Sequence, residues 1–417
     1  MKALILLLPS LAFFAFYGCI DEPNNIKLET INGVVYDMQG VPVPSLYVSS
    51  NNISLYRTNY NGKFILDNVS IPYNIFVSTG SDYFTSYFGI KSKNPNVITI
   101  LGNSPKGQRM LIVHFPPLQP GRSLILKLIG DNYHEQDKYF FHVHYATSVM
   151  ILIDVLINET SVNGKLLYLE GSGNSYEIYN YEKFGIKDFT FQPYETHVTF
   201  TTEDIRYNPE EREMTIYSPG NGELQHYYSE AYLYIDNIYN EFMLDMDAYS
   251  SYSYFTVPVL PNLEYDIKIV DQLRGNDWEQ STKWVHLQPG EDATIVHDPC
   301  PSILTPVNNA TGITNTTTFA ISDNSLDPSI YQYSFWLMTD GSGSYFVYDI
   351  YTDKKIFKPE ELIGGQFTFP PMKKFRWYVY KISNYNSMDE FVSTPFVLDS
   401  RYTSLQNSKK FKFTTAP

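Results

Sequence analysis

Aromatic residues constrain the fold of this chain more than any other feature. Its 417 residues include 36 tyrosines and 27 phenylalanines, set among many Val, Ile and Thr residues. Such side chains favour half-buried pleated surfaces. Helical spacing is almost absent, and the best helical segment is residues 358–363, with a proline near its start and two glycines after its end. The sequence therefore predicts an all-β fold.

The N-terminus has the layout of a secretory signal. Lys2 precedes an apolar run over residues 3–17, which ends in Gly18 and Cys19. This run is shorter than the roughly 20 apolar residues of a membrane-spanning helix and has the length of a signal-peptide hydrophobic region. The sequence therefore predicts an exported chain.

Residues 16–19, Phe-Tyr-Gly-Cys, resemble the lipobox of bacterial lipoproteins. The resemblance implies a signal peptide over residues 1–18, acylation of Cys19 and a polar tether over residues 19–25. Acidic residues just after the cysteine resemble a surface-export signal of Bacteroides-group lipoproteins. These resemblances imply an outer-membrane lipoprotein that is held by its lipid anchor and exposed at the cell surface.

Charge and cysteine content exclude several classes of protein. The chain has 30 Lys and Arg against 45 Asp and Glu, a formal charge of −15, and no basic run. Nucleic acid and anionic lipid headgroups are therefore not expected partners. Cys300 is the second of two cysteines, so the mature chain has no disulfide framework.

Residues 26–101 carry a specific turn pattern. It reads Gly33-x-Val-x-Asp37-x-x-Gly40-x-Pro42, and an Asn-Gly pair at residues 61–62 gives a strong hairpin signal. The pattern resembles the carboxypeptidase regulatory-like domain, a transthyretin-like β-sandwich of about seven strands in two layers. The resemblance implies a non-catalytic spacer or interaction module.

A short phrase recurs in the middle of the chain. An apolar residue followed by Gln-Pro occurs at residues 118–120, 191–193 and 287–289, each time before a predicted strand. Repeated units of this kind predict further sandwiches of related topology. We place them at residues 104–204 and 205–299, although a single domain over this region stays open.

The C-terminal part, residues 301–417, resembles a fibronectin type III or immunoglobulin-like domain. Its first segment, residues 304–312, carries the resemblance, and Phe375, Trp377 and Val379 alternate as the inward side of a central strand. Residues 393–396 and 411–413 are expected to form late strands.

Two histidines raise the question of a metal. His142 and His144 share one side of a predicted strand, a spacing that zinc sites use. A third ligand would have to come from His114, His134 or His197. The alternative is a pair of solvated imidazoles, and without a complete ligand set no metal or other cofactor is predicted.

Catalysis has little support in the sequence. Asp236, Asp245 and Asp247 are the nearest approach to the carboxylate pair of a glycoside hydrolase, but such clusters usually form solvated turns. No nucleophile, zincin or phosphate-binding motif occurs. We therefore predict a protein that is not an enzyme.

Aromatic side chains in polar surroundings give the best lead to a ligand. Tyr232 and Tyr234 share one face of a predicted strand, and Trp278 lies in a polar loop. Aromatic rings with nearby hydrogen-bonding groups suit sugars, although packing is the competing interpretation. We predict a surface-anchored binding or adhesion lipoprotein, with a glycan as the favoured ligand. One alternative is an assembly partner of an outer-membrane receptor or surface appendage. The other is a hydrolase or metal-dependent enzyme in the middle region.

Overall fold

The computed structural model describes most of the chain from Leu28 to Pro417. The described segments are residues 28–37, 41–50, 55–79, 83–99, 106–129, 138–141, 146–156, 162–173, 178–192, 195–207, 210–220, 224–235, 238–248, 250–259, 263–273, 279–325, 327–338, 347–363, 368–393 and 404–417. Strands dominate these segments, which confirms the all-β fold. Their helices are α2 (Pro359–Ile363), at the segment expected from the sequence, and α3 (Met388–Ser393).

The first part of the chain forms two sheets, which we name module 1. Its strands are β1 (Leu28–Tyr36), β2 (Tyr47–Ser49), β3 (Tyr56–Arg57), β4 (Lys63–Ser70), β5 (Tyr73–Ser78), β6 (Tyr83–Ile90) and β7 (Asn96–Ile98). One sheet has the order β4-β1-β7 and the other the order β3-β2-β5-β6. β1 is antiparallel to β4 and parallel to β7.

The same arrangement occurs twice more along the chain. Module 2 contains β8 (Lys106–His114), β9 (Arg122–Ile129), β10 (Lys138–Phe141), β11 (Ser148–Leu156), β12 (Val162–Gly173), β13 (Ile178–Phe191) and β14 (Glu195–Thr199), with β15 (Arg206–Tyr207) added beside β13. Module 3 contains β16 (Glu211–Tyr217), β17 (Leu224–Ile235), β18 (Ile238–Ala248), β19 (Tyr252–Pro258), β20 (Leu263–Leu273), β21 (Gln280–Leu287) and β22 (Ala293–Thr294). Their smaller sheets, β11-β8-β14 and β19-β16-β22, have the order of β4-β1-β7. The larger sheets β10-β9-β12-β13 and β18-β17-β20-β21 match β3-β2-β5-β6.

The recurring Gln-Pro phrase is a turn motif that the modules use at different points. Two of its copies end in glycines with positive φ, +76° at Gly121 and +87° at Gly290. In both, the amide after the glycine donates to the glutamine carbonyl, over 3.2 Å to Gln119 and 3.1 Å to Gln288. Left-handed backbone of this kind favours glycine. The phrase therefore encodes a turn that precedes the second strand of module 2, β9, and the seventh strand of module 3, β22.

The Asn-Gly pair forms a turn, but the hairpin expectation was wrong. Gly62 has φ of +65°, and its amide donates to the Asn59 carbonyl over 2.9 Å. The strands on either side belong to different sheets, because β3 pairs with β2 and β4 pairs with β1. The Asn-Gly signal specified the reversal of the chain. Which strands pair on either side of the turn depends on the burial of the apolar faces of the two sheets.

The C-terminal domain contributes the remaining elements. Its strands are β23 (Ser302–Thr305), β24 (Ala310–Ile313), β25 (Phe319–Ser322), β26 (Ile330–Leu337), β27 (Val347–Thr352), β28 (Ile356–Phe357), β29 (Lys374–Ile382), β30 (Ser404–Asn407) and β31 (Phe411–Thr415). β23, β25 and β28 form one sheet, and β29 lies centrally in the other, paired with β26, β30 and β31. Phe375, Trp377 and Val379 are fully buried on β29, which confirms the predicted inward face.

The prediction of a late strand over residues 393–396 was wrong at Ser393, which is the last residue of helix α3. Residues 394–396 lie outside the described segments. The helix starts with a capping arrangement in which the Glu390 amide donates to Ser387 Oγ over 3.2 Å, and Glu390 Oε2 accepts from the Asn386 amide over 2.8 Å. Ser-x-x-Glu is a known signal for a helix N-terminus. The other late strand is present as β31.

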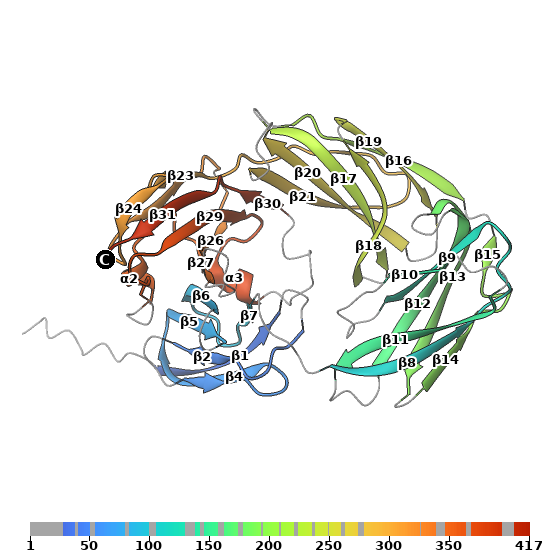
Figure 1. The fold of residues 1–417 in the computed structure, drawn as a ribbon, viewed down its shortest axis with the longest axis horizontal. Coiled ribbons are helices and arrows are strands. Elements are labelled where there is room, and N and C mark those ends of the chain that lie inside the picture. Colours follow the sequence, from blue (N-terminus) through green and yellow to red (C-terminus); the bar gives the residue numbers. More distant parts are fainter. Residues whose placement is uncertain are drawn as a thin grey trace, which may run out of the picture.

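The C-terminal domain connects modules 1 and 3 through backbone pairing. β27 pairs in parallel with β6 of module 1, and β30 pairs antiparallel with β21 of module 3. One continuous sheet therefore runs from β18 to β3 through the C-terminal domain. Figure 1 shows the resulting arc, in which the last part of the chain returns beside the first.

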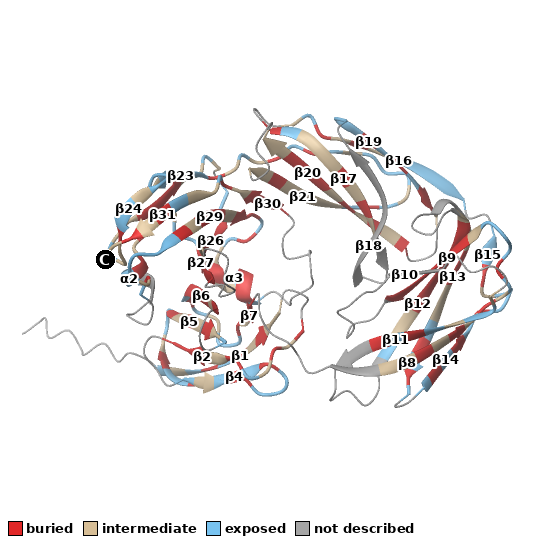
Figure 2. Ribbon diagram, viewed as in Figure 1, coloured by how far each residue is buried: buried red, intermediate tan, exposed pale blue. Residues whose placement is uncertain are grey.

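Neighbouring units also share hydrophobic cores. The core of module 1 includes Tyr351 of β27 and Phe391 of α3. The core of module 3 includes Ile125 and Leu167 of module 2. Buried segments lie along β6 and β27, where module 1 meets the C-terminal domain (Figure 2). Apolar area removed from water at these junctions stabilises the arrangement of the units as well as their folds.

Candidate functional site

Of the three residues predicted to bind a ligand, the structure describes the side chain of Tyr232 alone. Trp278 lies outside the described segments, and Tyr234 is placed only by its backbone in β17, opposite Tyr239. Tyr232 is half-buried, with its ring 5.3 Å from that of Trp284 and its hydroxyl donating to Glu230 Oε2 over 2.8 Å. Ligand binding by these three residues stays a prediction.

Lys268 connects the groups around Tyr232. Its ammonium lies 2.9 Å from Glu230 Oε2, 5.5 Å from the Tyr228 ring centroid and 5.7 Å from that of Trp284. Burial disfavours the charge, but the Glu230 carboxylate outweighs it, so the pKa of Lys268 is raised. The ammonium group thus makes cation–π contacts with the two rings while its aliphatic stem is partly buried. This cluster fits the packing interpretation, and Trp284 was not singled out from the sequence.

A more exposed aromatic set lies on the other sheet of module 3. We name Tyr217, Tyr252 and Tyr254 the tyrosine row. Tyr217 lies directly opposite Tyr252, with ring centroids 4.5 Å apart and planes inclined by 23°. The rings of Tyr252 and Tyr254 are 6.5 Å apart and inclined by 15°. Tyr252 is 46% exposed and Tyr254 is 55% exposed, so both rings reach solvent.

Strand alternation places these rings outward. Ser253 and Phe255, the neighbours of Tyr254 along β19, are both buried in module 3. Successive side chains of a strand point to opposite faces, so Tyr252 and Tyr254 share the outer face. The pattern Tyr-Ser-Tyr-Phe at residues 252–255 carried this signal, which the sequence reasoning missed.

Hydroxyl and carboxylate groups surround the tyrosine row. Thr215 lies opposite Tyr254, and Thr294 lies beside Tyr217. Glu213 and Asp292 are exposed on the same side of the module, and the Thr215 amide donates to Asp292 Oδ1 over 2.7 Å. The row is therefore an aromatic strip with polar neighbours and acidic edges.

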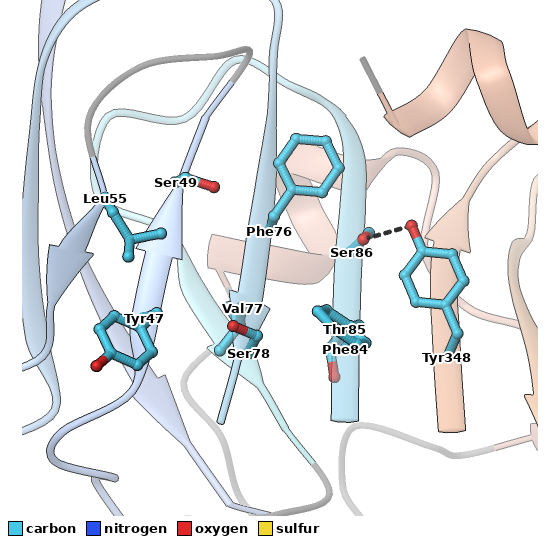
Figure 3. Close-up of a pocket in the computed structure, with 10 residues that line it drawn as sticks. All are labelled: Tyr47, Ser49, Leu55, Phe76, Val77, Ser78, Phe84, Thr85, Ser86 and Tyr348. Atoms are coloured by element: carbon cyan, nitrogen blue, oxygen red, sulfur yellow. Dashed lines mark hydrogen bonds between the residues drawn. The ribbon is translucent and has the colours of Figure 1, made fainter. Parts of the chain in front are cut away.

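A small pocket lies where module 1 meets the C-terminal domain (Figure 3). Its volume is about 180 Å³, comparable to the ~150 Å³ of a cavity that holds one benzene ring. Ser86 Oγ lies 2.9 Å from the Tyr348 hydroxyl at one wall. The lining residues are Tyr47, Ser49, Leu55, Phe76, Val77, Ser78, Phe84, Thr85, Ser86 and Tyr348. The pocket is composite, because Tyr348 belongs to β27 and the other residues to module 1.

Module 3 also contains a Ser–His–Asp array. His226 Nδ1 lies 3.2 Å from Asp271 Oδ1, and its Nε2 lies 3.3 Å from Ser229 Oγ and 3.4 Å from Ser253 Oγ. The order of groups resembles a hydrolase triad. However, the His226 and Asp271 side chains are 3% and 0% exposed, and both serines are buried. A substrate would have no access to these atoms, so the array is an internal hydrogen-bond network of the sandwich.

The remaining sequence candidates are only partly described. His142, His144 and Asp236 lie outside the described segments. Asp245 and Asp247 lie in strand β18 rather than in the solvated turn expected for them, because β18 continues its pairing with β17 through both residues. Within the described part of the chain, no group of three His, Cys, Asp or Glu side chains is placed to hold a metal ion.

Comparison with known proteins gave no match to a family model and none among curated proteins. Solved structures do align with this chain, and the following three each have a low TM-score. The Bacillus anthracis TIE protein aligns over 64% of this chain and 50% of its own length, with 11% identity and a TM-score of 0.16. A streptococcal ancillary pilin covers 66% of this chain and 90% of its own, with 14% identity and a TM-score of 0.19. BcpA, the major pilin subunit of Bacillus cereus, covers 66% of this chain and 100% of its own, with 8% identity and a TM-score of 0.14.

This chain thus spans half the length of the TIE protein. At identities and TM-scores this low, the similarities carry no argument about function. Among the helices that the structure describes, none is both long enough and apolar enough to cross a membrane.

Proposed function

We propose that this chain is a non-enzymatic, surface-anchored binding protein and that its tyrosine row binds a neutral glycan. The observation that carries the proposal is the exposure of Tyr252 and Tyr254, 46% and 55%, on one open sheet face. Large aromatic rings are costly to leave in water. Here two of them lie beside a third, Tyr217, with their planes nearly parallel.

The chemistry of the row suits a sugar chain. The apolar C–H faces of a pyranose pack on aromatic rings, and its hydroxyls bond to groups such as Thr215 and the tyrosine hydroxyls. Glu213 and Asp292 at the edges repel carboxylated or sulfated glycans, as does the net charge of −15. The proposal therefore commits to neutral glycans.

A glycan array tests the proposal with paired variants. The double variant Tyr252→Ala/Tyr254→Ala should lose roughly tenfold or more in affinity for a neutral glycan, since each aromatic contact contributes about 0.5–1.5 kcal/mol. Tyr60→Ala is the matched control, because Tyr60 is 74% exposed but lies in module 1. Equal binding by the wild type and the double variant would reject the tyrosine row as the site.

The anchoring part of the proposal rests on the sequence around Cys19. Mass spectrometry of the N-terminal peptide from membrane fractions should find an acylated Cys19, and proteases added to intact cells should remove the sandwich modules. An unmodified N-terminus beyond Cys19 would contradict the lipid anchor, and protection from protease would contradict surface display.

A further inference from the structure

Two histidines far apart in the sequence meet on the outer face of module 2. His114 is the last residue of β8, and His197 lies on the adjacent parallel strand β14. Leu111 and Val113 of β8 and Val198 of β14 point into the core, so both imidazoles point outward. His197 is 53% exposed. The pair is therefore held by a paired backbone and open to solvent.

The two rings meet edge to edge. His114 Nε2 lies 3.1 Å from His197 Nδ1, and the ring centroids are 5.4 Å apart with planes inclined by 5°. The centroid distance is close to the nitrogen–nitrogen distance plus the two ring radii. The rings therefore share a plane, and one nitrogen donates a hydrogen to the other.

Glu195 determines which nitrogen of His197 carries the hydrogen. Its Oε1 lies 2.5 Å from His197 Nε2. A carboxylate accepts hydrogen bonds, so Nε2 carries the hydrogen and Nδ1 presents its lone pair to His114. A carboxylate behind a histidine in this way orients imidazoles that bind metals.

We propose that His114 and His197 bind one late first-row divalent ion, Cu²⁺ more tightly than Zn²⁺. Metal–imidazole bonds of about 2.0–2.1 Å at tetragonal to tetrahedral angles place two nitrogens roughly 2.8–3.4 Å apart. The separation here, 3.1 Å, lies inside that interval. In the metal-free chain His114 Nε2 donates its hydrogen to His197 Nδ1, so metal binding requires that hydrogen to move to Nδ1 of His114 by exchange with water. A tilt of the two rings then directs both lone pairs to one point on the solvent side, where water completes the coordination.

Imidazole ligands favour this class of ion, and the order of divalent affinities places Cu²⁺ first. The proposal is independent of the glycan site, which lies in module 3. His114 and His197 are brought together by the pairing of two neighbouring strands, whereas His142 and His144 were considered because they lie two residues apart in the sequence.

Titration of the mature, full-length protein with Cu²⁺ tests the proposal, followed by calorimetry and electron paramagnetic resonance. We expect one Cu²⁺ per chain with hyperfine coupling to two imidazole nitrogens, displaced by excess Zn²⁺. His114→Gln and His197→Gln should each lose one coupled nitrogen and bind at least tenfold more weakly. Glu195→Gln should weaken binding by roughly 10-fold while both nitrogens remain.

Two control variants separate this site from other histidines. His286→Gln removes an exposed imidazole of module 3 and should leave the titration unchanged. The double variant His142→Gln/His144→Gln should also retain the two-nitrogen signal. Loss of the signal in that double variant, or its persistence in His114→Gln and His197→Gln, would overturn the proposal, as would an absence of stoichiometric binding.

Discussion

Asp349 lies directly opposite Thr85 in the parallel pairing of β27 with β6, and the two side chains are 0% and 1% exposed. A carboxyl group is thus buried at the junction that joins the end of the chain to its beginning. Ser334 Oγ donates a hydrogen bond to it. Burial raises the pKa of Asp349 to about 6, from an ordinary value of 3.8.

This buried carboxyl should make stability depend on pH. Because the pKa is higher in the folded state than in the unfolded chain, folding favours the protonated form. Stability should be greatest below pH 3.8 for this group, fall between pH 3.8 and 6, and be constant above, with a total change of about 3 kcal/mol. Asp349→Asn should remove this loss and stabilise the junction at pH 7.5.

Urea denaturation of the Asp349→Asn variant at pH 5 and pH 7.5 measures the effect. Asp353→Asn is the matched control, since Asp353 lies exposed just beyond the same strand. A pH dependence that is the same in wild type and Asp349→Asn would show that Asp349 does not titrate in this interval.

A buried ion pair should be essential to the C-terminal domain. Lys381 Nζ lies 3.3 Å from Asp323 Oδ1, and both side chains are 0% exposed. Burial alone would raise the pKa of Asp323, but hydrogen bonds, including that from the Tyr331 hydroxyl, and the charge of Lys381 outweigh it and lower the pKa. Lys381→Met leaves that carboxylate without its buried cation, and we expect a loss of about 3–5 kcal/mol.

The double variant Lys381→Met/Asp323→Leu should recover part of this loss, because it removes both charges together. Thermal unfolding of the two variants beside wild type measures the difference. If the single and double variants were equally destabilised, the uncompensated charge would not be the cause.

His286 should titrate above the ordinary histidine range. Its Nδ1 lies 2.8 Å from Asp266 Oδ1, and its Nε2 contacts the Glu264 carboxylate. Burial lowers its pKa, but the two carboxylates outweigh burial, so the pKa of His286 is raised above 6.5. A raised pKa stabilises the fold at low pH, and this contribution is lost as pH rises through the folded-state value. Asp266→Asn should lower the pKa of His286, which NMR titration of the imidazole protons would measure; Asp292→Asn is the control.

Gly62 should tolerate no side chain. Its φ is +65°, and a Cβ placed there would lie 2.5 Å from the Val35 carbonyl oxygen. Gly62→Ala should therefore cost more than the ~1–2 kcal/mol of left-handed backbone alone. Gly121 has φ of +76°, but a Cβ placed there would have open space around it. Gly121→Ala should therefore lower the free energy of unfolding only by the cost of left-handed backbone. Comparable denaturation midpoints for the two variants would contradict the steric argument.

Local patterns predicted the elements well where one face of a strand is buried. The alternation of Phe375, Trp377 and Val379 specified the inward face of β29, and the Gln-Pro repeats indicated related sandwiches. The Ser387–Glu390 capping signal of α3 is also present in the sequence. These features depend on residues within a few positions of one another, so they can be read without the fold.

The candidate sites were harder to predict. Strand alternation predicts that Tyr252 and Tyr254 point away from the core of module 3, but it does not predict that they are exposed to solvent. A side chain that points away from one core can still be buried against a neighbouring unit, as Asp349 is where β27 pairs with β6 of module 1. The pairing of Trp284 with Tyr232 and of His114 with His197 depends on which strands are neighbours.

Strand periodicity and turn chemistry are local, so the β class, the repeated turns and the inward face of the central C-terminal strand could be predicted from the sequence. The pairing of β27 with β6 and of β30 with β21, and the contact of His114 with His197, became visible in the folded chain alone. Any strand edge offers the same backbone donors and acceptors, so local sequence does not specify these partners. The choice among edges is made by the burial of whole faces, to which residues from distant parts of the chain contribute together.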